Sequence, residues 1–220
     1  MAVVFAISDL HAPFHHPDVL EYLAFVKSYY KPDRIVCLGD ELDQNALSVH
    51  TKELTLPTAL EEFTAAMLFM KKLYKLFPVV DVCISNHGSR PFRVAQAAGL
   101  PSVYMKSYSE FMEAPVGWRW HPRVIIDGVV YEHGDPCSGK DGAYKAAFEN
   151  RRSTVIGHIH AWGSVTYSAN HDNQMFWANA GCLVNPSSDV FRYSSKYRNK
   201  CTLGSVVVVD GKAAHFIRMD

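Results

Sequence analysis

The sequence lacks a net charge, because 22 lysine and arginine residues balance 22 aspartate and glutamate residues. No overall electrostatic field therefore holds the chain on a long polyanion, although local basic patches or bound cations leave nucleic acid open as a partner. The sequence also lacks a run of about 18 apolar residues, which a membrane span requires. Its apolar start, Met1–Ile7, has no basic leader and reaches Asp9 too early for a signal peptide. These absences predict a soluble, cytoplasmic protein with no membrane contact.

Cysteine is scarce and scattered. The five cysteines are odd in number and include no C-x-x-C pair, which favours reduced thiols over a disulfide framework or a thiolate zinc site. They are Cys37, Cys83, Cys137, Cys182 and Cys201. Repeats, low-complexity segments and linker-like tracts are also missing. A chain of this length, with 48% hydrophobic residues, is expected to form a single domain over residues 1–220 and to bury roughly 70% of its unfolded surface.

Three apolar runs in the first half of the sequence end in polar residues. Such runs are typical of strands that are buried on both faces of a sheet. Residues 17–30 and 57–77, which lie between the runs, have the apolar spacing of helices. This alternation predicts parallel strand pairing with helical crossovers. The runs are residues 2–7, 34–38 and 79–84, followed by Ser8-Asp9, Gly39-Asp40 and Ser85-Asn86-His87.

The second half of the sequence predicts mainly short strands. Residues 124–133 have the pattern of two strands about Asp127-Gly128, a tight-turn pair. The polar, tyrosine-rich residues 187–200 are expected to form a surface loop or an inserted lid. The predicted fold class is α/β, with two facing mixed β-sheets flanked by helices. The further strands are expected at residues 153–157, 163–167, 174–178, 203–209 and 213–219.

Carboxylate, imidazole and carboxamide side chains occur at the ends of these predicted strands. Asp9-x-His11 and His158-x-His160 each separate two of them by one residue, which places both side chains on one face of an extended backbone. Because sites in α/β sheets form outside the carboxyl ends of strands, we expect these side chains to converge. Oxygen and imidazole nitrogen are ligands of hard or borderline divalent metals. The candidate metal ligands are Asp9, His11, Asp40, Asn86, His133, His158 and His160.

The order of these motifs resembles that of the calcineurin-like metallophosphoesterases. The resemblance extends from about residue 3 to residue 186. Arg90, in the spacing N-H-x-x-R, is similar to an arginine of small bacterial and phage members. The shared motifs are Asp9-x-His11, Gly39-Asp40-x-x-Asp43, Asn86-His87, the isolated His133, Gly157-His158-x-His160 and Asn179-Ala180-Gly181-Cys182.

The resemblance implies a dinuclear metal-dependent phosphoesterase. A metal-bridging hydroxide would attack small or nucleotide-like phosphate mono- or diesters in line, with His87 as the general acid. Asp43 would orient His87, and Arg90 would hold a phosphate oxygen. Manganese is the metal expected first, and iron, nickel, cobalt or zinc also suit the ligands. One ion would be bound by Asp9, His11 and His160, the other by Asn86, His133 and His158, with Asp40 bridging the two.

Two departures from the family pattern bear on this interpretation. Gly88 stands where an acid usually follows the asparagine and histidine, which implies weaker support around the ligands. Gln44-Asn45 follows Asp43 where the protein phosphatase branch has Arg-Gly, so the phosphate-holding arginine of that branch is missing. The second departure argues against a protein phosphatase.

Two other functions stay open. A DNA or RNA phosphodiesterase would be consistent with the aromatic and basic residues between Phe191 and Lys200, because rings stack on bases and cations contact phosphates. A large DNA-gripping domain has little room in 220 residues. A catalytically inactive metal-binding scaffold is the other alternative. Missing ligands would favour the scaffold, but every ligand position and His87 are filled.

Overall fold

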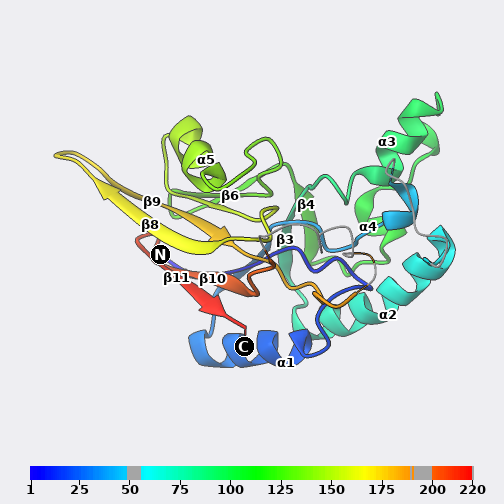
Figure 1. The fold of residues 1–220 in the computed structure, drawn as a ribbon, viewed down its shortest axis with the longest axis horizontal. Coiled ribbons are helices and arrows are strands. Elements are labelled where there is room, and N and C mark those ends of the chain that lie inside the picture. Colours follow the sequence, from blue (N-terminus) through cyan, green and yellow to red (C-terminus); the bar gives the residue numbers. More distant parts are fainter. Residues whose placement is uncertain (49–55, 189, 191–199, 220) are drawn as a thin grey trace.

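The computed structural model describes residues 1–48, 56–188, 190 and 200–219 (Figure 1). Nearly all of the predicted aromatic and basic contact strip, from Phe191 to Arg198, lies outside the described residues. The predicted loop or lid at residues 187–200 is therefore described only in part.

A six-stranded mixed sheet contains the three strands predicted from the first half of the sequence. Its strand order is β11-β10-β1-β2-β3-β4. The four strands β1 to β4 are parallel, and β10 pairs antiparallel with both β1 and β11. The strands are β1 (Val3–Ile7), β2 (Arg34–Cys37), β3 (Val80–Cys83), β4 (Trp118–His121), β10 (Gly204–Val209) and β11 (Ala213–Arg218).

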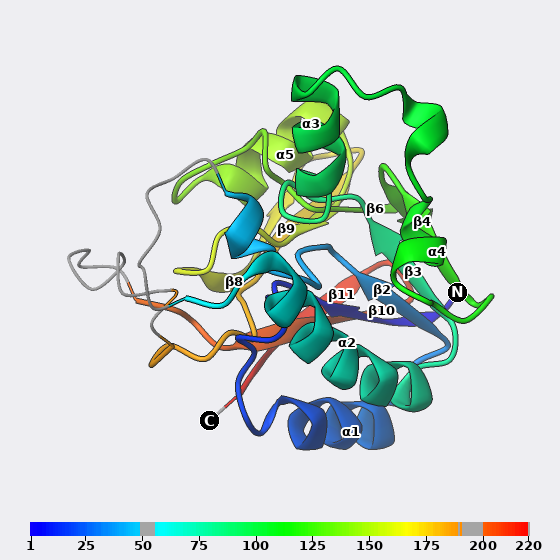
Figure 2. The ribbon, with the colours of Figure 1, turned by 90° about the vertical axis from the view of Figure 1, so that its right-hand side faces the viewer.

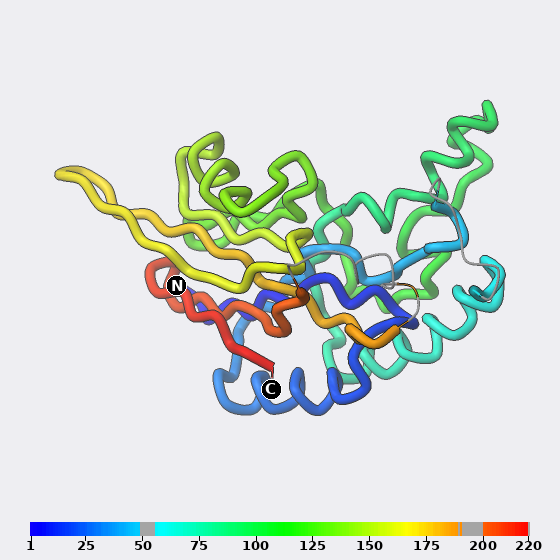
Figure 3. Tube along the Cα trace, viewed as in Figure 1, coloured from blue at the N-terminus to red at the C-terminus, as the bar shows by residue number. Residues whose placement is uncertain are grey.

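A second mixed sheet of five strands faces the first (Figure 1). Its order is β5-β6-β7-β9-β8, with β6, β7 and β9 parallel and the two outer pairs antiparallel. The hairpin of β8 and β9 extends beyond the rest of the fold at one end of its long axis, opposite to α3 (Figure 3). The strands are β5 (Val124–Ile126), β6 (Val129–Glu132), β7 (Thr154–Ile156), β8 (Gly163–Ala169) and β9 (Gln174–Ala180).

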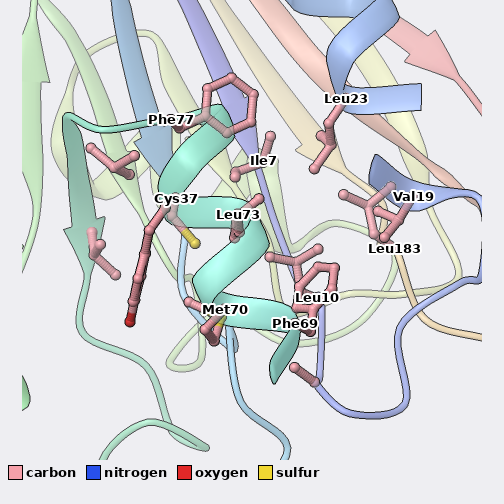
Figure 4. Packing of buried hydrophobic residues seen from close by; sticks show 14 of the residues in the cluster. Ile7, Leu10, Val19, Leu23, Cys37, Phe69, Met70, Leu73, Phe77 and Leu183 are labelled. Carbon is pink, nitrogen blue, oxygen red and sulfur yellow. The ribbon is translucent and has the colours of Figure 1, made fainter. Parts of the chain in front are cut away.

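Helices α1 (Val19–Tyr30) and α2 (Ala59–Leu76) cover the outer face of the six-stranded sheet (Figure 2). Thr58 and Glu61 cap the start of α2 reciprocally, each side chain accepting a hydrogen bond from the other's backbone N–H. The apolar face of α2, including Met70 and Leu73, packs together with Phe77 just after the helix on Ile7 and on other buried residues of the sheet and of α1 (Figure 4). This packing fixes β1 and β2, and therefore the residues that follow them.

Alternate residues of β1 pack in two different hydrophobic cores, one on each face of the sheet. Phe5 and Ile7 point to the helices, whereas Val4 and Ala6 face the second sheet and join the apolar layer between the sheets. That two-sided burial explains why the strand is an unbroken apolar run. The remaining helices are α3 (Arg90–Ala97), α4 (Tyr108–Phe111), α5 (Gly142–Asn150), which packs on the second sheet, and the 3₁₀ turns Asn45–Leu47 and Ser102–Tyr104.

The predicted fold class is confirmed, since two mixed β-sheets flanked by helices are observed. The parallel pairing of the first three strands is also confirmed. Strand β4 and the helices α3 to α5 were not predicted. Within the described residues, no helix combines the length and the apolar character needed to cross a bilayer.

Candidate metal centre

The candidate ligands lie where strands of both sheets end. Backbone hydrogen bonds join the segments that carry them, with Asp9 N donating to Gly39 O (3.1 Å) and Gly157 N donating to His133 O (2.9 Å). Across the two sheets, His158 N donates to Asp9 Oδ2 (2.9 Å), so residues that are far apart in the sequence meet where the sheets adjoin. The ligands that follow β1, β2, β3, β6 and β7 are Asp9, Asp40, Asn86, His133 and His158, respectively.

Asp9, His11 and His160 form a first group of side chains. His160 Nε2 lies 3.1 Å from Asp9 Oδ1 and 3.1 Å from His11 Nε2. One donor atom from each residue lies within 4.8 Å of the other two, as ligands of a single ion require. Asp9 and His11 are buried, whereas His160 is partly exposed. The structure thus brings together the three residues that the family resemblance implies as ligands of one ion.

Asp40 lies between this group and a second one. Its Oδ2 is 3.5 Å from His11 Nε2 and 3.4 Å from His133 Nε2. Asn86 Oδ1 is 2.6 Å from His133 Nε2, and a ring nitrogen of His158 lies within 4.8 Å of the donor atoms of Asp40 and His133. Because carboxylate oxygen and imidazole nitrogen suit borderline divalent cations, this donor set could hold divalent metal, with Asp40 shared by the two groups.

The outer nitrogens of two imidazoles also have partners. His11 Nδ1 lies 2.6 Å from Asp43 Oδ1, and His133 Nδ1 lies 3.0 Å from Leu38 O. In a metal-binding histidine, such contacts hold the ring orientation and direct Nε2 toward the ion. Asp43 therefore supports His11, a contact that the sequence did not predict.

Several of these side chains are presented by left-handed backbone. The φ angles are 50° for Asp9, 48° for His11, 50° for Asp40 and 64° for His158. Non-glycine residues seldom adopt this conformation, which occurs preferentially at functional sites. Gly157 is required for a different reason, because a Cβ there would lie 1.9 Å from Ser8 Oγ and 2.6 Å from Asp9 Oδ2. Glycine at position 157 lets the two sheets approach closely beside Asp9.

The charges of the site oppose one another at short range. Burial alone would raise the pKa values of Asp9 and Asp40, but hydrogen bonds and charges from neighbouring imidazoles outweigh it and keep both pKa values well below their usual range. Burial would lower the pKa values of His11 and His133, but nearby carboxylates, chiefly Asp43 for His11 and Asp40 for His133, raise both to about 9. In the same way, Asp9 raises the pKa of His160 to about 10 against the effect of burial. The buried carboxylates thus stabilise positive charge in the site, and when no metal is bound this charge is carried by protonated imidazoles.

These shifts predict a pH-dependent stability for the metal-free protein. A histidine whose pKa is raised by folding stabilises the fold fully below its unfolded value, 6.5, and loses that contribution as the pH rises through its folded value. For His11, His133 and His160, the loss spans pH 6.5 to about 10. Asp9 and Asp40 do not offset this loss of stability. Because their pKa values are lowered by folding, they stabilise the fold fully at every pH well above their unfolded value of 3.8.

We therefore expect the unfolding temperature of the protein in EDTA to decrease as the pH is raised from 6.5 to 9. With saturating manganese the trend should reverse, because the ion replaces the protons on the imidazoles and binds more tightly as they leave. Thermal unfolding curves over this range, with and without metal, measure both trends. Parallel curves in EDTA and in manganese would contradict the assignment of these histidines as ligands.

His87 lies beside the centre and contacts Asp43. Its Nδ1 is 2.6 Å from the Asp43 backbone carbonyl oxygen and 3.3 Å from Asp43 Oδ1. Its Nε2 is 3.9 Å from Asp40 Oδ2, so the imidazole faces the carboxylate between the two groups. Asp43 therefore contacts His87 as predicted, but chiefly through its backbone carbonyl.

Arg90 is tied to the same two residues. One terminal nitrogen donates to the Asp43 carbonyl oxygen (2.8 Å), and the other lies 3.1 Å from His87 Nε2. The sequence predicted a direct contact with a substrate phosphate. The observed contacts give Arg90 a second role, which is to hold His87 in position.

Arg90→Ala is accordingly expected to raise KM and also to lower kcat. A pure phosphate clamp would change mainly KM, because it stabilises bound substrate and transition state alike, whereas loss of the His87 contact acts on turnover. Steady-state kinetics of the variant on a phosphodiester measure the two constants separately. A raised KM with unchanged kcat would leave Arg90 with the clamp role alone.

Ser85 contacts Gly88, the residue at which the sequence departs from the motif that it resembles. Its hydroxyl oxygen accepts hydrogen bonds from Asp40 N (2.9 Å) and from Gly88 N (3.1 Å). A Cβ at position 88 would lie 3.0 Å from that oxygen. A side chain at position 88 would crowd the Ser85 hydroxyl, which accepts the hydrogen bond from Asp40 N, so glycine fits best there.

A pair of thiols beside His160 was not anticipated from the cysteine spacing. Donor atoms of Cys182, Cys201 and His160 lie within 4.8 Å of one another, although Cys182 and Cys201 are distant in sequence. All five cysteines are free, as the sequence predicted. Hydrogen bonds from Cys182 and His160 lower the pKa of the Cys201 thiol to about 5. Only the Asn179-Ala180-Gly181-Cys182 motif placed one of these thiols near the ligands.

The chain is broadly similar in arrangement to solved structures of vacuolar protein sorting 29. Vps29 of Cryptosporidium parvum is 14% identical over 99% of this chain and 98% of its own, with a TM-score of 0.44. Chaetomium thermophilum Vps29 is 9% identical over 100% and 97%, with a TM-score of 0.46. Wild-type Entamoeba histolytica Vps29, solved with Zn²⁺, is 12% identical over 99% and 98%, with a TM-score of 0.42. Comparison with family models and with curated proteins found no match. At these identities and TM-scores the likeness assigns no activity and no residue role.

Proposed function

We propose that the protein is a dinuclear metal-dependent phosphoesterase of the calcineurin-like type, similar to small bacterial and phage members. It hydrolyses phosphate mono- or diesters of small or nucleotide-like molecules. The single observation that carries this proposal is the Asp40 carboxylate, which lies within 3.5 Å of imidazoles from both ligand groups. A bridging carboxylate is what holds two cations close together despite their repulsion.

Two divalent cations, with manganese as the first choice, would supply a nucleophile at neutral pH and neutralise the charge on the phosphoryl oxygens. Asp9, His11 and His160 are the residues that would hold one cation. Asn86, His133 and His158 would hold the other, and Asp40 would contact both. The raised pKa values of His11, His133 and His160 mean that these side chains release protons when they bind metal.

The other polar residues act on the substrate. In the general-acid role, His87 Nε2, which lies 3.9 Å from Asp40 Oδ2, would carry the proton for the departing oxygen in place of the contact that it makes with Arg90. Asp43 holds the opposite nitrogen, Nδ1, through its backbone carbonyl, and so fixes the direction of the ring. Arg90 contacts both residues and keeps N–H groups available for a phosphate oxygen.

The test is a substrate screen combined with metal analysis. The purified chain, loaded with manganese, is assayed on bis-p-nitrophenyl phosphate, p-nitrophenyl phosphate, cyclic nucleotides and single-stranded DNA, with EDTA as the control. We expect turnover of at least one small ester, abolished by EDTA, and about two bound ions per chain by mass spectrometry. Turnover of DNA alone would identify a nuclease instead. Two bound ions with no turnover of any substrate would identify a metal-binding scaffold.

A further inference from the structure

A small cavity lies beside the candidate metal centre. Its volume is about 240 Å³, and Asn86, Arg90 and Arg93 contribute to its wall together with Leu47 and Ser48. Asn86 belongs to both places, since its Oδ1 lies 2.6 Å from His133 Nε2. No carboxylate is found among the described residues that line the cavity. A group bound here would therefore lie next to whatever occupies the metal centre.

Two guanidinium groups give the cavity its charge. The hydrogen bonds that Arg90 and Arg93 make within the described residues all end on groups without negative charge: the backbone carbonyls of Asp43 and Asn86, and the His87 ring. Burial lowers the pKa of Arg90, and the charge of Arg93 acts in the same direction, whereas the carboxylates of Asp43, Asp40 and Glu62 act against it. The two like charges thus lie near each other, and within the part of the chain that the structure describes neither is hydrogen-bonded to a carboxylate.

We propose that this cavity is a second anion-binding subsite, so that the preferred substrate is a phosphoester carrying a further phosphate beside the scissile one. This inference rests on the proposed function, because it places the scissile phosphate at the metal centre on the other side of Asn86. Guanidinium groups bind phosphate oxygens through charge-assisted and often paired hydrogen bonds. Each of the two arginines keeps N–H donors beyond those already used.

The size of the cavity indicates that it accepts one phosphate group of the ligand and not the whole ligand. Pockets that enclose complete small molecules measure roughly 300 to 1,000 Å³. At about 240 Å³, this cavity holds a phosphate with some water and leaves the rest of the ligand outside. The second phosphate could be joined to the scissile one directly, as in a nucleoside diphosphate, or across a sugar, as in a nucleoside bisphosphate. Both share the chemistry that the subsite recognises.

Paired ligands test this proposal. AMP is compared with ADP, and thymidine 5′-phosphate with thymidine 3′,5′-bisphosphate, at a fixed excess of manganese. Each is measured by isothermal titration calorimetry and as a competitive inhibitor of bis-p-nitrophenyl phosphate hydrolysis. We expect the second phosphate to tighten binding by about tenfold or more in at least one pair. An advantage for ADP alone indicates directly joined phosphates, and one for the bisphosphate alone indicates phosphates separated by a sugar.

Variants of the cavity test whether it is the source of the gain in affinity from the second phosphate. Arg93→Gln is expected to bring the affinity ratio of each favoured pair close to one, and Arg93→Lys, which keeps the charge, should retain part of it. The matched control is Arg152→Gln, an exposed arginine before β7 at the strand end opposite to the site, and it should keep the full ratio. The proposal is overturned if the wild-type protein shows no advantage in either pair, or if the advantage persists in Arg93→Gln.

Calorimetry separates this result from the proposed activity. If the protein binds the bisphosphorylated ligands more tightly but hydrolyses none of the esters, the subsite stands and the phosphoesterase proposal fails. If esters are hydrolysed but the second phosphate adds no affinity, the activity stands and the subsite fails.

Discussion

Asp40→Asn is expected to lower phosphoesterase activity by several orders of magnitude and to reduce bound metal from about two ions towards one. The substitution keeps the size of the side chain but removes the charge that contacts His11 and His133. Without that charge, the repulsion between two cations is no longer offset. Metal content per chain and kcat/KM on the best substrate of the screen are the two measurements.

A matched buried aspartate provides the control. Asp81 is 3% exposed and pairs with Arg34, away from the candidate ligands. Asp81→Asn should therefore keep both ions and the wild-type rate, assayed below its own unfolding temperature. A normal rate with two ions in Asp40→Asn would rule out the dinuclear assignment.

His87→Asn is expected to keep both metals and the fold while slowing the hydrolysis of esters with poor leaving groups. General acid catalysis typically contributes about 10² to 10⁴-fold. A p-nitrophenolate leaves without a proton, so its ester should lose little, whereas an alkyl or ribose leaving group needs the proton and should lose far more. Rates on matched aryl and alkyl diesters give this comparison directly.

Two further variants frame that result. His171→Asn changes an exposed histidine that matches no motif and should leave both rates unchanged. Asp43→Asn should slow the alkyl ester more mildly than His87→Asn, but it should also weaken metal binding because Asp43 Oδ1 is 2.6 Å from His11 Nδ1. Equal losses for both leaving groups in His87→Asn would assign His87 to charge stabilisation without proton donation. Loss of metal would make His87 a ligand.

The strands could be predicted where burial on two faces leaves an unbroken apolar run. Residues 3–7 are such a case, because the helices cover Phe5 and Ile7 and the second sheet covers Val4 and Ala6. Strand β4 was missed since Trp118–His121 alternates aromatic and polar residues without forming an apolar run. Its position depends on pairing with β3, a contact that local pattern does not encode.

The convergence of the candidate ligands could also be predicted, because it depends only on strand ends meeting at one edge. Contacts made by long side chains could not. Arg90 reaches the Asp43 carbonyl and His87 through rotamers that tertiary packing selects. In the same way, Cys201 lies beside Cys182 only because the segment before β10 runs alongside the segment that follows β9. Spacing in the sequence gives no sign of either contact.

At the left-handed turns that follow the strands, the side chains suited to metal binding lower the stability of the fold. Asp9, His11, Asp40 and His158 adopt a backbone that glycine would adopt at lower cost, and His158 is also partly buried, which lowers the pKa of its imidazole. Selection for heat resistance in the absence of metal would therefore favour glycine or asparagine at position 158, at the expense of cation binding. The side chains that make the centre are the ones that such a selection would remove first.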